Sequence, residues 1–186
     1  MVVTLSSGSP PLARGEASDW PSFERVYAEY FRSIWRTLRR LGVAPAQLDD
    51  AAQDVFVVVH RRLPEFDGRS LRGWLYAIAV RVASDYRRSS ALRKVLPARD
   101  TLIDPAPDPA RASELKESVR VLHTLLGALD ERKRTVFVLG ELEELSAPEI
   151  AEVLGVNLNT VYSRLRAARS EFEAALARHE RSRRQP

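Results

Sequence analysis

The side chains best suited to specific contacts lie near the C-terminal end of the chain, and they are hydrogen-bonding and cationic rather than nucleophilic. They belong to the segment NLNTVYSRLRAAR, residues 157–169. Apolar residues recur there at helical spacing, which predicts one buried and one exposed helix face; the buried stripe is Val161, Leu165, Ala168 and Phe172. The opposite face carries amide, hydroxyl and guanidinium groups suited to base edges and phosphates in a DNA major groove; it comprises Asn159, Tyr162, Ser163, Arg166 and Arg169, with Arg164 at the flank, nearer to phosphate.

The residues just before this segment predict how the helix is positioned. Ser146 and Glu149 have the spacing of a capping box, and Pro148 falls in the first turn, where its missing N–H is tolerated. Gly155 would supply a tight turn, and Asn157 is suited to cap the following helix. An ordinary capped hairpin with a solvated arginine face is the alternative. The combination of cap, glycine turn and polar face favours a DNA-binding helix-turn-helix.

A second constellation occupies residues 49–88. It begins with a helix whose first turn is acidic, at Asp49 and Asp50, which suits the helix dipole or a contact with a basic partner. After a polar loop from Glu65 to Ser70, cations and aromatics alternate as Arg69, Arg72, Trp74, Tyr76, Arg81, Tyr86, Arg87 and Arg88. Arginines that track phosphates and aromatics that stack on bases are typical of single-strand binding. Trp74 is predicted to be mostly core, with Tyr76, Arg87 and Arg88 as the exposed members.

Residues that could support catalysis or metal binding are scattered. The chain has no cysteine, and its three histidines, His60, His123 and His179, form no ligand pair in the sequence. There is no glycine-rich phosphate loop. We therefore predict no enzyme activity, no metal and no cofactor.

The elements that position these groups are all predicted to be helices. Apolar residues at three- and four-residue steps predict a helix over 20–41, ended by Gly42 and Pro45, a second over 49–62 and a third over 71–89. Residues 96–112 contain Pro97, Pro105, Pro107 and Pro109 and are typical of an exposed linker. Helical spacing resumes near Ser113, and a further helix should start after Asp130. The fold class is all-α, with two small helical domains joined by a proline-rich linker and a helix-turn-helix in the second.

Composition and charge set the broad class. The 186 residues are 45% hydrophobic and 29% charged, with a net charge of +4, as expected of a globular protein with an anionic partner. Basic residues concentrate in 81–99 and from 157 to the end, while five glutamates fall between 141 and 152. The N-terminus does not resemble a signal peptide, and no apolar run is long enough to span a membrane. The predicted organisation is a disordered tail (1–18), a helical domain (19–92), a linker (93–112), a second domain (113–178) and a basic tail (179–186), in a soluble cytoplasmic protein.

Two of these segments resemble one family. The sequence DDAAQDVFVVVHRRLPEFDGRSLRGWLYAIAVRVASDYRR, residues 49–88, looks like region two of the extracytoplasmic-function (ECF) sigma factors of bacterial RNA polymerase. The sequence LLGALDERKRTVFVLGELEELSAPEIAEVLGVNLNTVYSRLRAAR, residues 125–169, looks like their region four. Both segments occur in the family's order with a linker between them, so the resemblance is more specific than a lone helix-turn-helix.

The resemblance implies a sigma factor that binds core RNA polymerase, directs promoter-specific initiation and helps to melt promoter DNA. It implies that the polymerase clamp binds Asp50, Gln53, Asp54 and Phe56. It implies that the minus-ten element contacts Phe66, Asp67, Arg69, Ser70, Arg72, Tyr76, Arg87 and Arg88. It implies that the minus-thirty-five element is read by Asn159, Thr160, Tyr162, Ser163, Arg164, Arg166 and Arg169. Glu141 and Glu144 would lie near the polymerase flap, and an anti-sigma factor would hold the chain inactive, in the cytoplasm or at the inner face of the membrane.

Two other functions fit part of the sequence. A helix-turn-helix regulator that is not a polymerase subunit would account for residues 145–169 but not for the first domain. A helical interaction protein with sigma-like architecture would need no promoter. Binding to core polymerase separates a sigma factor from both.

Overall fold

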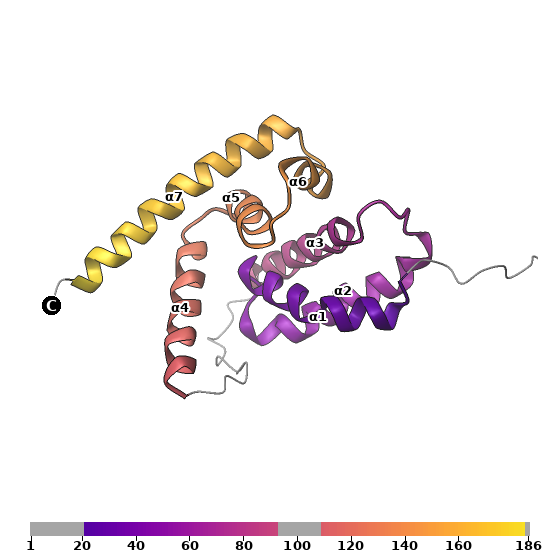
Figure 1. The fold of residues 1–186 in the computed structure, drawn as a ribbon, viewed down its shortest axis with the longest axis horizontal. Helices are drawn as coiled ribbons and strands as arrows, with labels where there is room; N and C mark the ends of the chain where they lie inside the picture. Colours follow the sequence, from indigo (N-terminus) through magenta and orange to yellow (C-terminus); the bar gives the residue numbers. More distant parts are fainter. Residues whose placement is uncertain (1–20, 93–108, 185–186) are drawn as a thin grey trace, which may run out of the picture.

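The computed structural model describes residues 21–92 and 109–184, and every regular element in these two ranges is helical, as predicted (Figure 1). The first range contains α1 (Phe23–Arg40), α2 (Leu48–Arg62) and α3 (Leu71–Leu92), with the short 3₁₀ turns η1 (Pro45–Gln47) and η2 (Leu63–Glu65). The second contains α4 (Pro109–Gly127), α5 (Glu131–Phe137), the π-helical turn η3 (Val138–Leu142), α6 (Ala147–Leu154) and α7 (Leu158–Arg184).

The helices α1, α2 and α3 pack against one another and form the first unit. Ser22 caps α1 by accepting a hydrogen bond from the Arg25 amide at 3.3 Å. Gly42 ends this helix region with a φ of +92°, which a residue with a side chain rarely adopts. The core between the helices consists of fully buried aliphatic residues: Val26, Ile34, Leu38, Ala51, Val55, Val59, Leu75, Ala79 and Ala83.

The helices α4 to α7 form the second unit, in which α7 packs against α4, α5 and α6. Asp130 caps α5 by accepting from the Lys133 amide at 3.0 Å, so the helix begins where the sequence predicted. The ring of Phe137 stacks on that of Phe172, with centroids 4.6 Å apart. Leu126, Val136, Leu139, Ile150 and Val161 are buried between these helices.

The helix α6 has the predicted capping box. The Ser146 amide donates to the Glu149 carboxylate at 2.8 Å, and the Ser146 hydroxyl oxygen accepts from the Glu149 amide at 3.4 Å. The hydrogen bonds from Ser146, from its side chain first and then its backbone, lower the pKa of Glu149. Pro148 lies in the first turn of the helix, as predicted.

The boundaries of the first three helices differ from the prediction by at most three residues, and two later boundaries differ by more. The helix α4 begins at Pro109 rather than near Ser113, because proline is tolerated in the first turn of a helix, where its N–H would have no partner. The helix α7 continues to Arg184, so residues 179–184 extend it instead of forming a separate tail. The predicted disordered tail, 1–18, and residues 93–108 of the predicted linker lie outside the described residues.

The two units touch. The helix α3 of the first unit lies beside α6 of the second (Figure 1). Side chains of α1 and α3 also contact α5 and the residue that follows η3. The sequence predicted two separate modules but not this contact. The contact between the two units decides which of the predicted binding residues face solvent.

Replacing Ser146 tests the cap of α6. Ser146→Ala removes both the acceptor for the Glu149 amide and a donor to its carboxylate, so the free energy of unfolding should fall by about 1 kcal/mol. Urea unfolding followed by far-ultraviolet circular dichroism at pH 7 measures this. The matched control is Ser170→Ala, at an exposed position inside α7. Equal stability of the two variants would contradict the role of the cap.

Candidate nucleic-acid interface

The helices α6 and α7 form the predicted helix-turn-helix. Gly155 ends α6 in the left-handed region, with a φ of +61°, and so provides the turn. The Asn157 side-chain oxygen accepts from the Asn159 amide at 2.7 Å, which caps α7. Val161, Leu165 and Ala168 are buried, as predicted. The buried stripe therefore fixes which face of α7 points away from the protein.

The outward face of α7 carries the predicted polar residues. Asn159, Tyr162, Ser163, Arg166 and Arg169 are exposed, and the side chain of Tyr162 is 54% accessible. Thr160 and Arg164 at the edges are half-buried. One cation on this face is already paired, since Arg169 Nη2 lies 2.7 Å from the carboxylate of Glu141. Arg169 is thus bound to one of the glutamates of residues 141–152, whereas the polar side chains in the first turns of α7 point to solvent.

The acidic face of α2 differs from the prediction at one position. Asp50, Gln53 and Asp54 are exposed, whereas Phe56 is buried against the rings of Tyr27 and Phe31, at centroid distances of 4.9 and 5.8 Å. Two residues beyond Asp54, a helix has turned by about 200°, so Phe56 points into the core. The prediction that Phe56 is a surface contact was wrong.

A hydrogen bond links the acidic face of α2 to α3. The Tyr86 hydroxyl donates to the Asp54 carboxylate at 2.7 Å. Burial, followed by this hydrogen bond, raises the pKa of Tyr86 to about 12. Tyr86 therefore stays protonated and keeps donating to Asp54 over the physiological range.

The loop before α3 exposes some of its predicted contacts and covers another. Asp67 and Arg69 are exposed and form an ion pair at 3.3 Å. The hydroxyl oxygen of Ser70 accepts from the Gly73 amide at 3.1 Å, at the start of α3. Phe66 is buried, with its ring 5.2 Å from that of Trp74, which is itself half-buried. Phe66 packs under the loop against Trp74 and is buried there. The prediction that it contacts DNA directly does not fit this structure.

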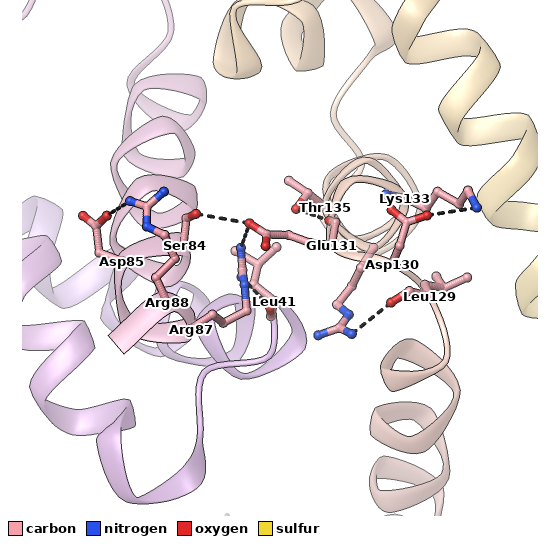
Figure 2. A network of polar contacts seen from close by, with 11 residues as sticks. Leu41, Ser84, Asp85, Arg87, Arg88, Leu129, Asp130, Glu131, Lys133 and Thr135 are labelled. Carbon is pink, nitrogen blue, oxygen red and sulfur yellow. Dashed lines mark hydrogen bonds and ion pairs between the residues drawn. The ribbon is translucent and has the colours of Figure 1, made fainter. Parts of the chain in front are cut away.

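Two of the three aromatic or cationic residues predicted to be exposed on α3 are covered. Arg88 is exposed as predicted, with 71% of its side chain accessible and an ion pair to Asp85. Tyr76 is only 2% exposed and Arg87 only 14%. Arg87 donates to the Leu41 carbonyl at 2.6 Å and to Glu131 of α5 at 2.5 Å (Figure 2). The prediction was wrong for Tyr76 and Arg87 because the second unit packs over this part of α3.

Glu143, which follows η3, is a polar residue that the sequence reasoning missed. It is 5% exposed, and its carboxylate binds Arg40 of α1 and Tyr76 of α3 at 2.7 and 2.6 Å. A signal was present, because Val136, Leu139 and Glu143 follow a helical i, i+3, i+7 spacing that puts Glu143 on a buried stripe. The acidic run was instead interpreted as one exposed surface.

The described residues contain no group of three or more histidine or acidic side chains arranged to hold a metal ion. Within the same ranges, no helix combines the length and apolarity that crossing a bilayer requires.

Comparison with known proteins covers both units. The family model of Sigma-70 region 2 matches residues 26–93, and that of Sigma-70, region 4, matches residues 120–172. The chain is 31% identical over 176 residues to the RNA polymerase sigma factor CnrH of Cupriavidus metallidurans, covering 88% of this chain and 91% of that protein. It is 29% identical to the ECF RNA polymerase sigma factor SigE of Mycolicibacterium smegmatis, over 90% of this chain and 66% of that one.

A solved structure agrees with these matches. The structure of CnrH in complex with the cytosolic domain of CnrY aligns with a TM-score of 0.63 at 28% identity, covering 83% of this chain and 87% of that chain. The matches account for both units, whereas a lone helix-turn-helix regulator would explain only the second. This chain belongs to the ECF group of RNA polymerase sigma factors, which bind core polymerase and direct it to promoters.

Proposed function

We propose that the exposed face of α7 reads the minus-thirty-five promoter element. The observation that carries this assignment is the sidedness of α7, where a buried aliphatic stripe leaves amide, hydroxyl and guanidinium groups pointing outward. We assign Asn159, Tyr162 and Arg166 to base edges, and Thr160, Ser163 and Arg164 to base edges or phosphates. Arg169 joins them once it leaves Glu141.

The first unit supplies the contacts to polymerase and to the minus-ten element. We assign the acidic face of α2, with Asp50, Gln53 and Asp54, to the polymerase clamp, and support it by the exposure of these three side chains. Phe56 supports that face from inside the core. Asp67, Arg69, Ser70 and Arg88 face solvent or lie partly exposed beside α3, where an opened strand can be bound. Arg72 is exposed on the same surface, and Tyr76 and Arg87 join it after the second unit moves away.

The wider proposal follows from the family. The chain works as two DNA-binding domains, a first ending near residue 92 and a second that includes α4 to α7, and it acts in the cytoplasm by binding rather than by catalysis. The solved structure of CnrH contains the cytosolic domain of CnrY. By analogy, we propose that an anti-sigma protein also binds this chain.

Removing the Arg166 guanidinium should weaken binding to duplex promoter DNA. An arginine that contacts a base edge contributes about 1–3 kcal/mol of discrimination, so Arg166→Ala should reduce affinity about 5- to 150-fold at fixed salt. Electrophoretic mobility shift of the holoenzyme on a promoter selected from genomic fragments measures this. The control is Arg178→Ala, which removes an exposed charge from the same helix outside the proposed reading face. Equal losses in both variants would contradict the assignment.

Reversing the charge of Asp54 should weaken assembly with core polymerase. Asp54→Arg puts a cation on a face proposed to meet a basic partner, so we expect at least a 10-fold loss in affinity. Fluorescence anisotropy of labelled protein titrated with core polymerase measures it. Glu180→Arg makes the same charge change at an exposed position of α7, and unfolding curves check that Asp54→Arg still folds. Wild-type assembly by folded Asp54→Arg would refute the docking face.

A further inference from the structure

We propose that the free chain is held closed by a latch at Glu143, and that the closed form covers part of the strand-binding surface of the first unit. The closed interface is defined by contacts from α1 and α3 to the second unit; it comprises Thr37, Arg40, Arg72, Gly73, Tyr76, Ser84 and Arg87 on one side, and Glu131, Arg134, Glu143 and Val153 on the other.

The Glu143 carboxylate is the centre of this interface. One oxygen accepts from Arg40 Nη1 and from the Thr37 hydroxyl, each at 2.7 Å, and the other accepts from the Tyr76 hydroxyl at 2.6 Å. The backbone carbonyl of Glu143 accepts from Arg72. Burying a carboxylate without partners is strongly unfavourable, and here all the side-chain partners come from the other unit. These partners surround the Glu143 carboxylate only when the two units are in contact.

The backbone around Glu143 favours this placement. The turn η3 widens the end of the α5 region into a π-helical turn, in which the Glu143 amide donates to the Val138 carbonyl at 3.0 Å. The next residue, Glu144, has a φ of +55°, in the left-handed region. Short π-helical turns such as η3 often occur at functional sites. Here the turn carries the Glu143 side chain towards α1 and α3.

A second polar contact reinforces the latch. Glu131 Oε1 accepts from Arg87 at 2.5 Å and from the Ser84 hydroxyl at 3.1 Å, and Figure 2 shows Ser84 and Arg87 both pointing towards Glu131. The Arg87 hydrogen bond is the main cause of the lowered pKa of Glu131. Arg87 is held between the Leu41 carbonyl of its own unit and a carboxylate of the other.

Two glycines of the first unit lie next to side chains of the second unit. A Cβ atom at Gly73 would lie 3.8 Å from Val153 Cγ2 of α6, an ordinary van der Waals distance. A Cβ atom at Gly42 would collide with the guanidinium of Arg134 from α5. The two units are therefore in van der Waals contact near Gly73, and the absence of a side chain at Gly42 leaves room for the Arg134 guanidinium.

The closed interface covers Tyr76 and Arg87, whereas Arg72 contacts the Glu143 carbonyl but stays exposed. The inference therefore rests on the proposed role of Tyr76 and Arg87 in strand binding. Residues bound within the interface cannot also bind a strand. If only the open form binds a strand, the apparent affinity is the affinity of the open form multiplied by the fraction of chains that are open. The segment 93–108 is long enough for the units to part, since an extended chain spans about 3.3–3.6 Å per residue.

Neutralising the latch should open the chain. Hydrogen bonds to charged groups are strong enough that Glu143→Gln should shift the equilibrium towards the open form by about 10-fold or more. Because the chain has no cysteine, Arg61→Cys and Glu173→Cys provide two exposed dye sites for energy transfer between the units. We expect a lower transfer efficiency in Glu143→Gln and tighter binding to oligo(dT). The control Glu152→Gln makes the same charge change at an exposed site on α6.

The outcomes separate the latch from the strand-binding assignment. Transfer efficiency in Glu143→Gln equal to that of Glu152→Gln would refute the latch. A fall in efficiency with unchanged oligo(dT) affinity would support the latch and refute the occlusion of Tyr76 and Arg87. Neither outcome depends on promoter recognition by α7, which the Arg166 variant tests separately.

Locking the interface should have the opposite effect. Gly73→Cys combined with Val153→Cys puts two thiols at this contact, where a Cβ atom at position 73 would lie 3.8 Å from Val153 Cγ2 and 3.2 Å from Ser70 Oγ. After a small shift of the Ser70 side chain, we expect the thiols to form a disulfide across the interface. The oxidised protein should bind oligo(dT) at least 10-fold more weakly than the same protein after reduction. The reduced form is the matched control, and circular dichroism checks that both forms are folded. Failure to form the disulfide, or equal binding by both forms, would overturn the proposal.

Discussion

The arrangement of the two units depends on one buried carboxylate. Glu143 leaves water only because Arg40, Thr37 and Tyr76 of the other unit replace its hydration with a cation and two hydroxyl donors. When the units separate, each of these groups must find other hydrogen-bond partners. Water or a bound macromolecule can supply them. Burial, with a smaller effect of the Glu143 hydrogen bond, raises the pKa of Tyr76, which keeps its hydroxyl protonated and donating.

The contact creates a conflict between packing and binding that suits a regulated transcription factor. Arg87 and Tyr76 are cationic and aromatic groups of the kind that bind an opened strand, yet the closed form uses them to hold the second unit. By contrast, Arg166 and Tyr162 on α7 and Asp54 on α2 remain exposed. The closed chain thus keeps the faces proposed to bind polymerase and to read duplex DNA open to solvent, while part of the proposed strand-binding surface is covered.

Local features of the fold were predictable from the sequence, and long-range ones were not. The start of α5 after Asp130, the cap at Ser146 and the turn at Gly155 were identified correctly, because each is set by residues within one helical turn. Pro109 was assigned to the linker because the same residue type both breaks a helix interior and begins a helix.

The wrong site residues were wrong for a shared reason. Periodicity places a residue on a helix face but does not say what packs over that face. Phe56 and Phe66 are covered within the first unit, while Tyr76 and Arg87 are covered by the second. Glu143 is the converse case, since its partners lie more than 60 residues away in the chain. The resemblance to ECF sigma factors identified the family but carried no information about this contact.

Hydroxyl-radical footprinting of the free chain tests the central claim most directly, because Tyr76 and Tyr162 report within one molecule on a covered and an open surface. Tyr162 is 54% exposed and Tyr76 only 2%. If the free chain is closed, Tyr76 should be oxidised many times more slowly than Tyr162. Oxidation of the two tyrosines at similar rates would show that the second unit does not cover the first in solution.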